Sequence, residues 1–108
     1  MSNWTIANSS ELYRIDGWGA GFFKANDKGT VSVFPDGDGK SVDLCNIVED
    51  LVRRGVKPPH LIRFDGIIRQ RARTIYDSFD KAIAEFNYQG NYTLTYPVKV
   101  NQQRGVVE

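Results

Sequence analysis

A long helical stripe between two short apolar segments constrains the fold of this chain most. Between residues 65 and 86, apolar side chains recur at the three- and four-residue spacing of one helix face, and Asp65 is placed to cap the start of the helix. The flanking segments, 60–64 and 92–100, have the residue types of strands. A strand, a helix and a second strand in this order predict a βαβ unit with parallel strands, and therefore an α/β fold.

Two further elements are expected nearer the N-terminus. A short apolar run, a turn-forming stretch and an alternating apolar–polar run predict a β-hairpin over 21–34. Residues 44–52 carry apolar side chains at helical spacing, so a second helix is expected there. Ser41 or Asp43 can cap the start of this helix, and Gly55 can close its end.

Charge and cysteine content exclude several classes of function. The net charge is only +1, which argues against a protein that binds nucleic acid or an anionic membrane. Cys45 is the only cysteine, so one chain can form neither an internal disulfide nor a multi-cysteine metal site. Residues 1–4 show neither the basic nor the apolar region of a signal peptide, so no secretory leader is expected, and no apolar run approaches the roughly 20 residues of a membrane helix. We therefore expect a soluble, cytoplasmic protein without nucleic-acid or membrane partners.

Lys99 has a suggestive place in the second expected strand. Alternate side chains of a strand point to opposite faces, which puts Lys99 on the small, polar face near the carboxyl end of 92–100. Parallel α/β folds bind ligands beyond the carboxyl ends of their strands. A lysine there suits Schiff-base formation when it is buried or lies near other cations. The pattern is also compatible with a strand-end lysine that simply extends into water.

Several segments match one known family in collinear order. They are 12–19 (Leu-Tyr-Arg-Ile-Asp-Gly-Trp-Gly), 42–55, 58–64, 82–90 and 96–104 (Tyr-Pro-Val-Lys-Val-Asn-Gln-Gln-Arg). Together they resemble the N-terminal portion of the biosynthetic, pyridoxal-phosphate-dependent arginine decarboxylases. The resemblance covers nearly all of the chain, and its order argues against a chance match.

The resemblance implies a larger fold than this chain can build. The family has an alanine-racemase-like (β/α)₈ TIM-type barrel that binds pyridoxal phosphate, together with a separate β-rich domain. Residues 1–40 then correspond to a β-hairpin segment of the β-rich domain, and residues 41–108 to the start of the barrel, with about two of its strands. Such a barrel needs about 250 residues, and the chain has 108. We therefore expect a fragment, or one piece of a split enzyme whose partner chain supplies the rest of the barrel.

The resemblance also implies a reaction. The family decarboxylates L-arginine to agmatine and carbon dioxide, which feeds polyamine synthesis (putrescine and spermidine), and it is described as magnesium-dependent and oligomeric. Lys99 falls where the family's lysine forms a Schiff base with pyridoxal 5'-phosphate, so Lys99 is expected to be both the catalytic and the cofactor-binding residue. No magnesium ligand is assigned. We expect the isolated chain to be inactive, because the other cofactor- and substrate-binding elements of the family lie outside it.

Two alternatives stay open. A related barrel decarboxylase of another basic amino acid would share Lys99 and the cofactor, and only the N-terminal match favours arginine. A non-catalytic α+β interaction module would keep the sequence without aldehyde reactivity at Lys99. If the chain is such a module, it should be a folded monomer with a cooperative thermal transition. If it is a fragment, it should be molten and should aggregate.

Overall fold

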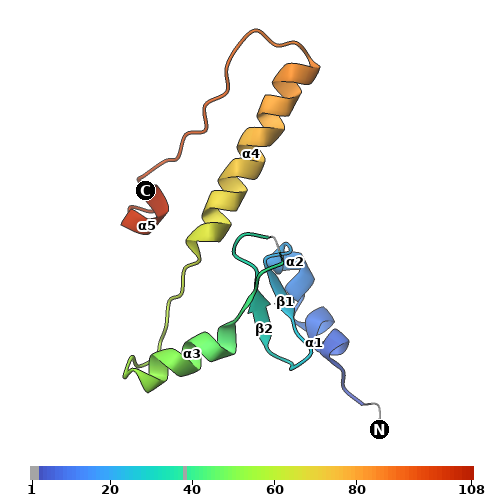
Figure 1. Cartoon of the computed structure of the whole chain (residues 1–108), viewed down its shortest axis with the longest axis vertical. Coiled ribbons are helices and arrows are strands. Elements are labelled where there is room, and N and C mark those ends of the chain that lie inside the picture. Colours follow the sequence, from blue (N-terminus) through green and yellow to red (C-terminus); the bar gives the residue numbers. More distant parts are fainter. Residues whose placement is uncertain (1–2, 38) are drawn as a thin grey trace. The chain divides into compact units, whose positions relative to one another are not determined.

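The computed structural model describes residues 3–37 and 39–108, which fall into two compact units, Met1–Arg63 and Phe64–Glu108 (Figure 1). The expected mixed α/β character is confirmed. The first unit contains α1 (Ile6–Leu12), α2 (Ile15–Gly19), β1 (Phe23–Ala25), β2 (Val31–Val33), β3 (Val42–Asp43) and α3 (Leu44–Arg53). The second unit contains α4 (Asp65–Glu85) and α5 (Arg104–Val107). The expected division at residue 40, between pieces of two larger domains, stays a prediction.

The predicted hairpin is confirmed as the centre of the first unit. β1 and β2 pair antiparallel with Phe23 opposite Val33, and β3 adds to the other side of β2. Asn26 holds the turn, because its side-chain oxygen accepts hydrogen bonds from the backbone N–H groups of Lys28 (3.0 Å) and Thr30 (3.1 Å). The turn chemistry visible in the sequence therefore sets the register of the sheet.

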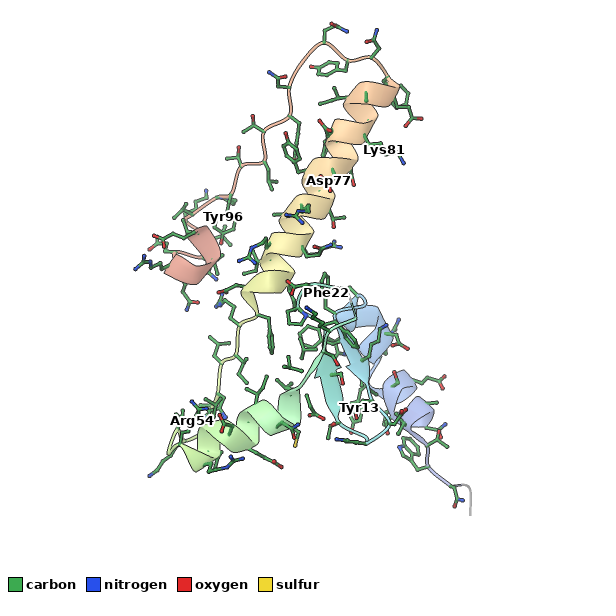
Figure 2. The ribbon with its side chains drawn as sticks, in the orientation of Figure 1. Tyr13, Phe22, Arg54, Asp77, Lys81 and Tyr96 are labelled. Atoms are coloured by element: carbon green, nitrogen blue, oxygen red, sulfur yellow. The ribbon has the colours of Figure 1, made fainter. Side chains whose placement is uncertain are left out.

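The core of the first unit is small. Its buried apolar side chains are Ile15 at the start of α2, Phe22 just before β1, and Val33 in β2, which is fully buried. Figure 2 shows Phe22 beside the two strands of the hairpin. Trp4 and Trp18 stay more than half exposed. These three buried apolar side chains, counted over residues 3–37 and 39–63, give this unit a modest hydrophobic contribution to folding.

Two N-terminal helices were not predicted. α1 has a capping box, in which the Asn8 backbone N–H donates to the Thr5 hydroxyl (3.2 Å) and the Thr5 backbone N–H donates to the Asn8 side chain (2.9 Å). α2 includes Gly17 and Gly19, which are poor helix formers. Tertiary packing of Ile15 therefore stabilises a short helix that local propensity disfavours.

The predicted helix at 44–52 is confirmed as α3. Of the two possible caps, Asp43 is the one used, because its carboxylate accepts a hydrogen bond of 2.9 Å from the Cys45 backbone N–H. Gly55 closes the other end with φ +86°, and its N–H donates to the Val52 carbonyl at 3.0 Å. Residues next to each end of α3 were thus sufficient to predict where the helix begins and ends.

The long helix is confirmed as α4, with one correction at its start. The N-cap is Phe64, which makes no side-chain capping bond, and Asp65 is the first helical residue. The expectation that Asp65 is the N-cap was therefore wrong by one residue, although its charge still lies in the first turn, where the helix dipole favours it. Asn87 ends the helix with φ +49°. No helix in the described ranges combines the length and the apolarity needed to cross a bilayer.

The two strands expected around α4 do not form, so the predicted βαβ unit was wrong for this chain. Residues 60–64 and 92–100 lie within the described ranges and contain no strand. A strand exists only through hydrogen bonds to a neighbour, and a lone parallel pair is weak. Pro97 also lacks an N–H to donate. Neither the two expected barrel strands nor the (β/α)₈ barrel is therefore confirmed.

Candidate functional site

Lys99, the predicted site residue, lies in a turn rather than at the end of a strand. The Val100 backbone N–H donates to the Pro97 carbonyl at 3.0 Å, which makes Lys99 the third residue of a turn over 97–100. Lys99 is exposed, and within the described residues its amine makes no hydrogen bond or ion pair. The amine is therefore free to react with a carbonyl compound from solvent.

Tyr96 and Asn101 bracket the turn that carries Lys99. The Tyr96 hydroxyl donates a hydrogen bond of 3.1 Å to the Asn101 carbonyl, and the Asn101 side-chain oxygen accepts from the Gln103 backbone N–H at 3.0 Å. Tyr96 lies on the segment that returns from α4 toward α5 (Figure 2). The backbone around Lys99 thus has a defined local conformation although its side chain is free.

An aromatic stack joins this segment to α4. The rings of Tyr92 and Phe79 are nearly parallel, with centroids 4.1 Å apart and an interplanar angle of 7°. Tyr76, one helical turn before Phe79, places its ring 6.1 Å from Tyr92 in a tilted arrangement. The sequence interpretation placed Tyr92 on an apolar strand face and did not foresee this stack. Aromatic residues at 76 and 79 were its only local signal.

A hollow of about 510 Å³ lies between α4 and the C-terminal end of the chain. Its lining consists of Asp65, Ile68, Arg69 and Ala72 from α4, and of residues 104–108. The Arg104 guanidinium forms an ion pair with the Glu108 carboxylate, with 2.6 Å between Nε and Oε2. Lys99 is not part of this lining. The charged side chains that line this hollow therefore do not form a site together with the Lys99 amine.

The described residues fit pyridoxal phosphate at one point. Lys99 supplies a primary amine without a competing partner, which suits the aldehyde carbon of such a cofactor. In the part of the chain that the structure describes, no hydrogen bond or ion pair links Lys99 to a second cofactor-binding group. The chain thus offers the attachment point, and the pocket around it is not assembled.

A metal site is not assembled in the described residues either. Within 3–37 and 39–108, no group of three His, Cys, Asp or Glu side chains lies close enough to hold a metal ion. The magnesium implied by the family resemblance therefore stays a prediction, with no ligand assigned.

A polar cluster in the first unit was not predicted from the sequence. The Thr30 hydroxyl and the Asn26 amide donate to the same Asp43 carboxylate oxygen, at 2.5 and 3.2 Å. The Thr30 hydrogen bond is the main cause that lowers the pKa of Asp43 below its ordinary value of 3.8. The cluster borders a polar hollow of about 390 Å³ and joins the hairpin to α3. Asn26 and Asp43 were expected only as turn and cap.

The single thiol does not have the features of a nucleophile. Cys45 is exposed, and its Sγ lies 3.7 Å from Oε1 of Glu49 one helical turn later. Desolvation, followed by the charge and hydrogen bond of Glu49, raises the pKa of the Cys45 thiol. A raised pKa leaves less thiolate at neutral pH, so Cys45 is poorly suited to covalent catalysis.

Comparison with known proteins identifies relatives over the whole chain. A protein named biosynthetic arginine decarboxylase from Gloeobacter violaceus is 50% identical over 109 aligned residues, covering 100% of this chain and 17% of that protein. Proteins of the same name from Citrifermentans bemidjiense and Prochlorococcus marinus (strain MIT 9303) are 49% and 46% identical, covering 100% and 98% of this chain. No family model matches the chain.

The resemblance inferred from the sequence is therefore confirmed. This chain is similar along its whole length to proteins named biosynthetic arginine decarboxylase, and it spans about 17% of the length of those relatives. The aligned region extends over the complete chain and therefore spans both structural units.

Proposed function

We propose that this chain is a segment of a biosynthetic arginine decarboxylase, and that the complete protein converts L-arginine to agmatine and carbon dioxide for polyamine synthesis. The observation that carries the proposal is the 50% identity with a protein of that name over the whole chain. Because the chain spans only 17% of that relative, the activity belongs to the longer protein. The isolated chain is expected to be inactive.

In this proposal Lys99 holds pyridoxal phosphate through a Schiff base. The bound cofactor supplies the electron sink for loss of the carboxylate as carbon dioxide. Two observations support Lys99 as the attachment point: its amine is exposed without a partner in the described residues, and it lies in the segment 96–104 that resembles the family's lysine segment. The Lys99 amine would be the group that holds the cofactor covalently.

The fold proposed for the complete protein is a (β/α)₈ barrel with a β-rich domain. Segments 60–64 and 92–100 have strand-forming residue types but no strand partner in this chain. Neighbouring strands of the longer protein would supply the missing hydrogen bonds. Magnesium dependence, a homo-oligomeric state and a cytoplasmic location belong to the same proposal, without residues assigned to them.

Arginine is the substrate that the comparisons favour over other basic amino acids. The relatives from Gloeobacter, Citrifermentans and Prochlorococcus all carry arginine in their names. The described side chains include no group that can be assigned to the arginine guanidinium. The preference for arginine therefore rests on the relatives alone.

A segment exchange tests the proposal directly. This chain replaces the matching segment of the Gloeobacter violaceus relative, and agmatine is measured after incubation with L-arginine and pyridoxal phosphate. We expect agmatine from the exchanged protein and none from its Lys99→Ala variant. Lys81→Ala, which removes an exposed lysine of α4, is the matched control and should retain activity.

Three results would contradict the proposal. If the exchanged protein folds but makes no agmatine, this chain does not support arginine decarboxylation and the proposed activity is wrong. Decarboxylation of lysine or ornithine in preference to arginine would favour the other basic amino acids. Reductive trapping with borohydride that labels Lys81 and Lys99 equally would remove Lys99 as the cofactor lysine.

A further inference from the structure

The charged side chains of α4 are segregated along the helix. Basic residues dominate its first half, at positions 69, 71 and 73, and acidic residues dominate its second half, at 77, 80 and 85. The exceptions are Asp65 in the first turn and Lys81. Like charges four residues apart, such as Arg69 and Arg73, weaken an isolated helix. The segregation therefore does not contribute to the stability of α4 on its own.

Four of these side chains share one side of the helix. At about 100° per residue, Arg69, Arg73, Asp77 and Asp80 fall within about 80° around the helix axis, and we call them the charged strip of α4. Figure 2 shows Asp77 midway along the helix. All four residues are exposed, and among the described residues none of them forms an ion pair. The strip therefore presents two unpaired positive and two unpaired negative charges to solvent.

The charged strip stays at the surface in the complete protein of the proposed function. Apolar side chains of α4, among them Ile68, Ile75 and Phe79, lie on roughly the opposite side of the helix, which is the side that a barrel core would cover. Burial of four unpaired charges is too costly for the strip to join that core. A strand at 92–100 is compatible with this arrangement, because it would pack on the apolar side.

An antiparallel second copy of α4 matches the charged strip. The midpoint between positions 69 and 80 is 74.5, and the midpoint between positions 73 and 77 is 75. A two-fold axis through this level therefore places Arg69 opposite Asp80 of the second copy and Arg73 opposite its Asp77, and each contact occurs twice. A parallel pair in register would instead bring like charges together.

We propose that the charged strip of α4 is an interface with a second copy of this chain, in which two α4 helices pair antiparallel. The four opposite-charge contacts select the partner and its orientation, and the surrounding surface of the longer protein adds contact area. The inference rests on the proposed function in one respect, since the barrel of the complete protein covers the apolar side of α4 and leaves the strip outside.

The expected effect follows from the strength of exposed ion pairs. Each such pair changes an association constant by roughly 1.5- to 5-fold. Replacement of all four contacts by like charges should therefore weaken self-association by roughly tenfold or more. High salt should act in the same direction, because it screens exposed charges.

The experiment uses the exchanged full-length protein without cofactor or arginine. Sedimentation velocity measures its assembly at several protein and salt concentrations. The acidic variant, Arg69→Glu/Arg73→Glu, and the basic variant, Asp77→Arg/Asp80→Arg, each give the strip a single sign of charge. Each variant is measured alone and in an equimolar mixture of the two. Far-UV circular dichroism checks that each variant is folded.

A matched control changes the net charge outside the strip. Lys28→Glu/Arg71→Glu alters the charge by the same amount as the acidic variant, at two exposed positions. Lys28 lies in the hairpin turn, and Arg71 points about 200° away from Arg69 around α4. This control should assemble like the parent protein. An equal loss of assembly in the control would show an effect of net charge and would overturn the proposal.

The proposal expects a smaller assembly for each variant alone and recovery of the parent assembly in the mixture. The mixture is decisive, because only contact between two copies lets the acidic strip of one meet the basic strip of the other. The proposal is wrong if the parent is monomeric, if the acidic variant assembles like the parent, or if the mixture stays as small as its components. Agmatine formation is measured separately, so failure of the proposed function and failure of this interface are distinguishable.

Discussion

The hydroxyl of Thr30 donates a hydrogen bond of 2.5 Å to the carboxylate of Asp43, the residue that also caps α3. One carboxylate thus joins the end of the hairpin turn to the start of a helix 13 residues later. Asn26 donates to the same oxygen as Thr30, and the Cys45 backbone N–H donates to the other oxygen, so the turn and the helix share one carboxylate. The arrangement makes the first unit sensitive to the protonation of Asp43.

Acid should weaken the first unit through Asp43. Its pKa is lowered in the folded state, mainly by Thr30, so ionised Asp43 stabilises the fold above its ordinary pKa of 3.8. This contribution is lost as the pH falls from that value through the lower pKa of the folded state. We expect Thr30→Val to reduce the acid sensitivity and Thr30→Ser to retain it. Urea unfolding at pH 7 and pH 3 measures the difference. Equal pH dependence in all three proteins would contradict the assignment.

Tryptophan fluorescence reports on this unit selectively. The chain has two tryptophans, Trp4 and Trp18, and both belong to the first unit. Their emission during unfolding therefore follows residues 1–63 and not the Lys99 segment.

Val33→Ala should destabilise the first unit by about 2 kcal/mol, because it removes two buried methyl groups and leaves a cavity. Val33 is fully buried at the centre of the sheet. Its partner on β3, Val42, is 43% exposed, so Val42→Ala should cost less than about 1 kcal/mol. Urea unfolding followed by tryptophan fluorescence compares the two. Equal losses would show that Val33 is not a core residue.

Gly55→Ala should destabilise α3 by about 1 kcal/mol. Gly55 has φ +86°, which an L-residue rarely adopts, whereas the space around it is open. The cost therefore comes from the backbone and not from a clash. Gly17→Ala is the control: Gly17 has open space within α2 and no positive φ, so the substitution should be neutral or stabilising. Circular dichroism during heating measures both, and a neutral Gly55→Ala would contradict the helix end described above.

Glu49→Gln should increase the rate at which iodoacetamide alkylates Cys45 at pH 7.5. Desolvation raises the pKa of the thiol most, and the Glu49 carboxylate adds to it, so removal of that charge should increase the thiolate fraction. We expect the rate to rise, because a larger fraction of the thiol is then ionised at the same pH. Glu11→Gln, on α1, should leave the alkylation rate unchanged. A rate unaffected by Glu49→Gln would show that the carboxylate does not act on Cys45.

Elements fixed by local signals could be predicted from the sequence. The turn at Asn26, the cap at Asp43 and the left-handed end at Gly55 each depend on residues within one turn of the chain. The capping box of Thr5 and Asn8 is a local signal of the same kind, with Asn8 in the place where glutamate or glutamine is usual.

Elements that depend on distant residues could not be predicted. The residue types at 60–64 and 92–100 favour strands, but a strand also needs a hydrogen-bonded neighbour, which this chain does not provide. The same limit applies to the site. Lys99 was assigned a role through a family resemblance. The contacts of Tyr92 with Phe79 and of Thr30 with Asp43 each join residues 13 positions apart in the sequence, so they are visible only in the three-dimensional structure.

The contrast between the two units has a consequence for the lifetime of the chain. α4 has no buried residue along its 21 positions, and the segment after it is almost entirely exposed. Protease cleavage requires a few residues to open locally, which is easiest where few side chains are buried. Limited trypsin digestion should therefore cut at Arg69, Arg71, Arg73 and Lys81 before Lys24 in the hairpin. A cell that makes this polypeptide alone would degrade its C-terminal portion first, and the lysine at 99 would be lost before the N-terminal unit.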